Sequence, residues 1–146
     1  MKANPVSIVV GLLLLAFSPF TVAQEPKTVG DWLDRGGVQV AREELVKLLS
    51  GAVNSGVQHG TNAKFRNDMK EDGSLKGTAV LANGQTVDVF GKWTVGQNGE
   101  LLNELNNSKG SRWKSSIFYF KFENKYFGAS SRDRSTQLLE REIERK

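Results

Sequence analysis

Apolar and polar residues alternate over most of the second half of the chain. Between residues 65 and 129, turn-forming pairs interrupt this alternation, and glycines at positions 73, 84, 99 and 110 recur at intervals of 11, 15 and 11 residues. A period of two, broken by such turns, is typical of antiparallel strands joined by short hairpins. The pattern therefore predicts a mainly β (α+β) fold, with a single antiparallel meander coiled into a half-barrel or barrel.

Side-chain parity predicts the register of this sheet, because residues paired across antiparallel strands point to the same face. Three-residue loops that end in glycine place that glycine where the left-handed conformation is needed. With such loops Met69 pairs with Leu75, and Val95 pairs with Leu101. The predicted inner face consists of Ala63, Phe65, Met69, Leu75, Ala79, Leu81, Val87, Val89, Trp93, Val95, Leu101 and Leu105.

Residues 117–122 depart from this pattern because they carry large apolar side chains at both parities. A two-residue turn at 124–125 would pair Phe122 with Phe127. Burying both faces of this strand requires either a β-bulge that swaps the parity or a helix over the outer face. We predict a bulge or sharp bend near Ser115, with coverage by the N-terminal helix as the alternative.

Two helical stretches precede the sheet. Residues 31–37 predict a short helix with Asp31 as its N-cap and a glycine pair as its stop. Residues 41–50 predict an amphipathic helix, because Leu45, Leu48 and Leu49 share one face. We expect these helices to cap the sheet; the alternative for the second is a partner-binding or membrane helix.

The C-terminal residues 130–146 change character. A polar linker is followed by apolar residues among alternating charges. This composition predicts a charged C-terminal helix, with a frayed, solvated tail as the alternative.

Residues 1–23 resemble a secretory signal peptide. Lys2 precedes an apolar run at 6–17, and a small-residue pattern ends at Ala23, where we expect cleavage. The alternative, a membrane anchor, requires about 20 apolar residues. Without cysteine, no lipid can be attached through a thiol. We therefore expect a periplasmic or secreted protein without a stable membrane anchor, with a linker at 24–30 and a domain at 31–129.

Composition excludes several kinds of chemistry. Without the Lys2 of the signal, 19 basic and 16 acidic residues leave a net charge of +3, interspersed along the chain, so nucleic-acid binding is not expected. The absence of cysteine removes disulfides, thiol nucleophiles and ordinary zinc sites. No phosphate-binding glycine motif is present, so no cofactor is expected. One histidine and no cysteine leave too few ordinary zinc ligands, so no metal is expected.

Candidate catalytic residues are few. His59 is the only histidine and lies in a polar loop, where a solvated role is expected and a catalytic one is the alternative. The acidic residues Asp68, Glu71 and Asp72 could bind calcium weakly, although turn formation explains Asp72 fully. We therefore expect no catalytic residues and no enzyme activity.

Aromatic side chains are numerous for so small a sheet. In a partly closed barrel they would either fill the core or line an apolar pocket. If a pocket exists, we expect Trp93, Trp113 and Tyr119 to bind the ligand, because their polar edges can orient it.

A family resemblance covers roughly residues 31–126. The stretch Glu-Glu-Leu-Val-Lys-Leu-Leu-Ser-Gly at 43–51, the Asp-Gly-Ser-Leu-Lys-Gly turn at 72–77, and Gly-Lys-Trp-Thr-Val at 91–95 followed by Asn-Gly-Glu-Leu at 98–101 carry it. The chain resembles small exported bacterial proteins of unknown function of the DUF995 type. The resemblance implies a lipocalin-like or open-barrel β-fold and no established activity. The cysteines that members often carry are absent here.

These observations favour an exported, non-enzymatic β-protein that binds an apolar small molecule or an envelope protein. The alternatives are a carboxylate-dependent hydrolase, for which the predicted inner face offers no acid-base pair, and an inhibitor or interaction module that acts through exposed loops such as 103–110.

Overall fold

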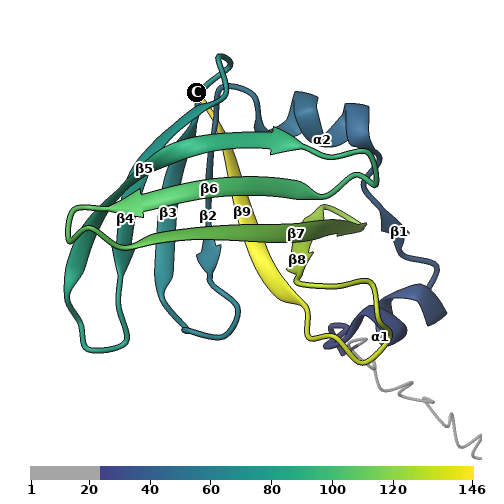
Figure 1. Ribbon diagram of the computed structural model, residues 1–146. Coiled ribbons are helices and arrows are strands. Elements are labelled where there is room, and N and C mark those ends of the chain that lie inside the picture. The colour runs from purple at the N-terminus through teal and green to yellow at the C-terminus, as the bar shows by residue number, and fades with distance from the viewer. Residues whose placement is uncertain (1–23) are drawn as a thin grey trace, which may run out of the picture.

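The computed structural model describes residues 24–146, so the expected signal peptide and its cleavage site at Ala23 lie outside the described residues. Within them, eight strands form a closed antiparallel barrel and one short strand pairs beside it (Figure 1). The elements are α1 (Val29–Asp34), β1 (Val38–Gln39), α2 (Arg42–Leu49), β2 (Ala52–Val57), β3 (Lys64–Met69), β4 (Ser74–Val80), β5 (Thr86–Val95), β6 (Leu101–Asn107), β7 (Arg112–Phe122), β8 (Lys125–Ala129) and β9 (Leu139–Arg145). The predicted mainly β meander, coiled into a barrel, is confirmed. Neither helix in this part of the chain is long and apolar enough to cross a membrane.

The barrel closes because β7 has two partners. Its first half, residues 112–117, pairs with β6, and its second half, residues 118–122, pairs with β8. Strand β8 pairs with β9, which returns to β2. Beyond the end of β6, the short strand β1 pairs with Phe120 and Lys121 of β7. Each strand from β2 to β9 thus pairs with a neighbour on both sides over at least part of its length.

The predicted register of the meander is confirmed. Met69 lies opposite Leu75, and Val95 lies opposite Leu101. The turn glycines adopt the left-handed conformation that the three-residue loops require, with φ of +83° at Gly73. Of the predicted inner face, Phe65 and Leu81 are partly exposed, and the other residues are buried.

Two predictions about the aromatic strand are wrong. Pairing of β7 with β6 runs without interruption past Ser115, so no bulge is present there. The last hairpin turns at residues 123–124, one residue earlier than predicted, and Phe120 pairs with Phe127. Glu123 adopts a positive φ of +53° in this turn. Because the shift moves each pairing by two residues, the faces of the side chains are unchanged.

A second hydrophobic core outside the barrel explains why β7 carries aromatic side chains on both of its faces. Helix α1 packs Trp32 against the outside of the barrel, and the ring of Trp32 is fully buried. The outer aromatic cluster consists of Trp32, Phe118, Phe120, Phe122 and Phe127, with Val29, Ala129 and Leu138 beside them. The alternative arrangement, coverage by an N-terminal helix, is therefore the one found.

Helix α1 begins earlier than predicted. Its N-cap is Thr28, whose hydroxyl accepts from the Asp31 backbone N–H, while the Asp31 carboxylate accepts from the Thr28 N–H. This reciprocal capping box makes Asp31 the third helical residue instead of the cap. The helix consequently includes the end of the segment expected to be a linker.

The C-terminal segment is strand β9 instead of the predicted helix or tail. Leu139, Arg141 and Ile143 alternate with charged residues, a period of two that suits a strand with one buried face. Strand β9 pairs with β2 on one side and with β8 on the other. The last residues of the chain therefore complete the barrel.

The interior core is capped by α2, whose Leu45 and Leu49 are fully buried within it. Strands approach one another closely at Gly77 and Gly91. A Cβ on either glycine would overlap a backbone carbonyl of the neighbouring strand, at Arg66 and Glu104 respectively. The absence of a side chain at these two glycines thus permits the close approach of strands in the coiled sheet.

Candidate functional site

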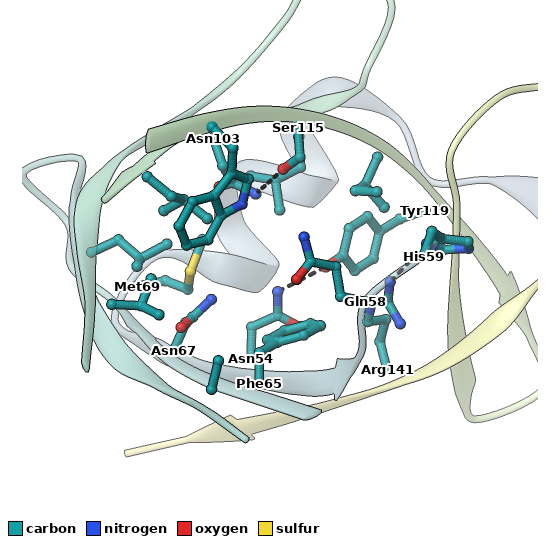
Figure 2. Close-up of a pocket in the computed structure, with 17 residues that line it drawn as sticks. Asn54, Gln58, His59, Phe65, Asn67, Met69, Asn103, Ser115, Tyr119 and Arg141 are labelled. Atoms are coloured by element: carbon teal, nitrogen blue, oxygen red, sulfur yellow. Dashed lines mark hydrogen bonds between the residues drawn. The ribbon is translucent and has the colours of Figure 1, made fainter. Parts of the chain in front are cut away.

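A cavity of about 60 Å³ lies inside the barrel (Figure 2). One water requires a cavity of roughly 10–15 Å³, so the space is equivalent to a few waters or to a molecule of a few non-hydrogen atoms. Its walls combine apolar side chains with amides, two hydroxyls, one imidazole and one guanidinium. The seventeen lining residues are Asn54, Gln58, His59, Phe65, Asn67, Met69, Leu75, Ala79, Val89, Leu101, Asn103, Leu105, Trp113, Ser115, Ile117, Tyr119 and Arg141.

Three buried asparagines give the cavity unpaired polar atoms. Asn54 donates through Nδ2 to the Tyr119 hydroxyl at 2.8 Å, and Asn103 donates to Ser115 Oγ at 3.1 Å. The side-chain oxygens of Asn54, Asn67 and Asn103 have no hydrogen-bond partner and no contact with bulk solvent. Because buried polar groups are normally paired, these oxygens mark places where a bound molecule can donate hydrogen bonds.

The hydroxyl groups of Tyr119 and Ser115 can donate hydrogen bonds to a bound molecule. Each hydroxyl accepts from an asparagine Nδ2, which leaves its own O–H free to donate. Burial raises the pKa of Tyr119, while the charge of Arg141 and the Asn54 hydrogen bond oppose that shift. The phenol therefore remains protonated near neutral pH and serves as a donor.

Arg141 and His59 lie together at one side of the cavity (Figure 2). Arg141 Nη2 lies 3.4 Å from His59 Nδ1, and His59 Nε2 lies 3.3 Å from the Gln137 carbonyl. These contacts suit a neutral imidazole that accepts at Nδ1 and donates at Nε2. Burial and the neighbouring Arg141 charge lower the pKa of His59, which favours this neutral form.

The three residues predicted to bind a ligand do not lie together. Trp113 and Tyr119 line the cavity, whereas Trp93 packs in the surrounding core and donates its indole N–H to the Lys70 carbonyl at 2.9 Å. Aromatic side chains thus divide between core and cavity. That Trp113 and Tyr119 contact a ligand stays a prediction.

Asn67 and Asn103 were not predicted as site residues, although the sequence pattern indicated that both point into the barrel. Asn67 shares its parity with Met69, and Asn103 shares its parity with Leu101, so the predicted register already placed both amides inside. Arg141 was missed for another reason, because the tail was interpreted as a helix. His59, predicted to be a solvated loop residue, is instead partly buried at the cavity.

Acidic residues lie elsewhere among the described residues. The cavity lining contains no Asp or Glu, so a carboxylate-dependent hydrolase would find no acid-base pair there. Glu140 and Glu142 line a shallow groove on the outer face of β2 and β9. Asp72 accepts from the Ser74 N–H at 2.8 Å as a turn residue, and Asp68 pairs with Lys146.

The predicted interaction loop at 103–110 is mostly strand. Strand β6 continues to Asn107, and Asn103 points into the barrel, so only residues 108–110 form the tip of this hairpin. A partner that recognised this hairpin would contact a small turn instead of a long loop.

Comparison of the chain with protein-family models, with curated proteins and with solved structures finds no match. The DUF995-type resemblance therefore stays an expectation, and function is inferred from the cavity.

Proposed function

We propose that this protein is an exported, non-enzymatic β-barrel that binds a small molecule of mixed polarity in its interior cavity. The observation that carries the proposal is the set of unpaired amide oxygens of Asn54, Asn67 and Asn103, whose residues line the interior cavity. A ligand that is apolar on one side and donates hydrogen bonds on the other fits both kinds of wall. Export is supported by the signal-peptide pattern of residues 1–23.

Three unpaired amide oxygens destabilise the barrel unless a ligand pairs with them. Each buried polar group without a partner costs about 1–3 kcal/mol. Apolar residues at positions 67 and 103 would have made a more stable core, as at the neighbouring Met69 and Leu101, which are buried. A ligand that satisfies these groups also stabilises the fold by binding only the native state.

The proposal is tested by native mass spectrometry of the mature protein from its exporting host, compared with the denatured mass. We expect a constant additional mass of a small molecule. The variant Ala79→Leu, which fills part of the cavity, should lose that mass. Val80→Leu is its matched control, because Val80 neighbours Ala79 and is 38% exposed on the outer face.

Other outcomes would contradict the proposal. A bare monomer from the native host would point to a core that water completes and would direct the search to a protein partner. Retention of the additional mass by Ala79→Leu would place the ligand outside the cavity.

A further inference from the structure

The cavity contains a buried cation without a counter-anion. Arg141 is only 4% exposed, and no Asp or Glu among residues 24–146 forms an ion pair with it. None of the other lining residues is acidic. Buried charges are normally paired, because removing a charge from water is costly. The barrel therefore holds one uncompensated positive charge next to its internal space.

The surrounding strands are shaped to hold this guanidinium. Gly56 of β2 and Gly128 of β8 flank Arg141 on both sides. A Cβ on Gly128 would lie 2.9 Å from Arg141 Cζ, and one on Gly56 would lie 2.9 Å from Nη1. The guanidinium carbon also lies 5.2 Å from the centre of the Phe65 ring. Two glycines and an aromatic face thus form a slot for the planar group.

Neutral groups satisfy only part of Arg141. Nη1 donates to the Val57 carbonyl at 3.0 Å and lies near the carbonyls of Leu139 and Glu140. Nη2 contacts His59, and Nε has no partner. Carbonyl dipoles solvate the cation without neutralising it. Tyr119 does not supply the missing charge, because burial raises the pKa of its phenol and keeps it protonated.

We propose that the ligand of the cavity is a small organic monocarboxylate whose head group binds at Arg141. This inference rests on the proposed function and adds the chemical class of the ligand. One guanidinium beside a neutral imidazole matches a single negative charge, and Arg141 Nε and the Tyr119 O–H are the available donors. Apolar side chains such as Met69, Leu75 and Ile117 surround the body of the molecule.

The remaining polar groups define the other side of the ligand. Asn67 and Asn103 lie away from the His59 and Arg141 side in Figure 2. Their unpaired oxygens accept hydrogen bonds, so a hydroxyl or amino substituent there would be recognised. The cavity of about 60 Å³ limits the ligand to a few non-hydrogen atoms and excludes long acyl chains.

The test compares carboxylates with neutral amides of the same shape by titration calorimetry of the mature protein at pH 7.5. The probe pairs are acetate with acetamide, benzoate with benzamide, and octanoate with octanamide. We expect acetate to bind at least tenfold more tightly than acetamide, and octanoate not to bind. Equal affinities for acetate and acetamide would overturn the inference while leaving a small-molecule binder in place.

Variants separate recognition by Arg141 from a purely structural role. Arg141→Met should remove the preference for acetate over acetamide, whereas Arg145→Met, which replaces an exposed arginine on the same strand, should retain it. Gly128→Ala keeps the charge but displaces the guanidinium, and should weaken acetate binding. A preference that survives Arg141→Met would assign Arg141 a structural role only.

Failure of this inference is distinguishable from failure of the proposed function. If no carboxylate binds but the native protein still carries a small molecule, the inference is overturned and the proposed function stands. If the native protein is also bare, both are overturned.

Discussion

Asn54 of β2 donates a hydrogen bond of 2.8 Å to the hydroxyl of Tyr119 of β7 across the interior of the barrel. Both side chains are buried, and the two residues are 65 positions apart in the sequence. The contact joins strands that are not neighbours in the sheet. It therefore fixes the two side chains that line the cavity next to Arg141.

Tyr119→Phe should destabilise the protein by about 1–3 kcal/mol, because Asn54 would then have no partner for either side-chain polar atom. The double variant Asn54→Leu/Tyr119→Phe should recover part of the loss, since both polar groups are then removed. Urea unfolding of the four proteins in a double-mutant cycle measures the coupling. If the changes in the free energy of unfolding are purely additive, the hydrogen bond between Asn54 and Tyr119 contributes nothing to stability.

Trp93 and Trp113 should respond differently to truncation. Trp93→Ala removes a buried core side chain and its hydrogen bond to Lys70, and should cost about 3–5 kcal/mol. Trp113 is only partly buried and lines the cavity, so Trp113→Ala should cost less stability but alter ligand binding. Unfolding followed by circular dichroism, together with native mass spectrometry, separates the two. Equal losses of stability would assign Trp113 to the core.

The outer aromatic cluster should contribute to stability independently of the cavity. The ring of Trp32 lies 5.0 Å from that of Phe127 and 5.2 Å from that of Phe122. Trp32→Ala should therefore cost about 3–5 kcal/mol while ligand binding persists. Leu33→Ala is the control, because the neighbouring Leu33 is 43% exposed. If both variants lower the free energy of unfolding by the same small amount, α1 does not act as a cap.

The meander could be predicted from the sequence because neighbouring strands are joined by short hairpins, whose pairing depends only on nearby residues. Each hairpin glycine, such as Gly73, fixes a loop length, and parity then determines every pairing along the two strands. The same parity placed Asn67 and Asn103 inside, although their polar character kept them out of the predicted inner face. The register was therefore predictable, and so in principle was the position of these two asparagines in the cavity lining.

Long-range contacts could not be predicted in the same way. Residues 138–144 mix Leu and Ile with charges at spacings compatible with either a helix or a strand, and only pairing with β2 and β8 decides between them. The bulge near Ser115 was predicted because a one-sided sheet cannot bury both faces of β7. Helix α1 buries the second face through Trp32, a contact almost 90 residues distant in sequence.

The protonation state of His59 should make stability depend on pH. His59 faces Arg141 of β9 and the backbone carbonyls of Gly128 and Gln137. Burial and the Arg141 charge lower its pKa in the native state below the ordinary value of 6.5. The unfolded chain therefore binds this proton more readily, so the contribution of His59 is fully present above pH 6.5 and is lost as the pH falls through the native pKa.

We accordingly expect the free energy of unfolding to decrease between pH 7.5 and pH 5.5, and His59→Asn to reduce that decrease. Asparagine retains an acceptor oxygen toward Arg141 but cannot take up a proton. Because His59 is the only histidine, the difference between the two proteins in urea unfolding at the two pH values isolates its contribution. An identical dependence on pH in both proteins would show that His59 has the same proton affinity in the folded and unfolded chain, and hence that neither burial nor Arg141 lowers its pKa.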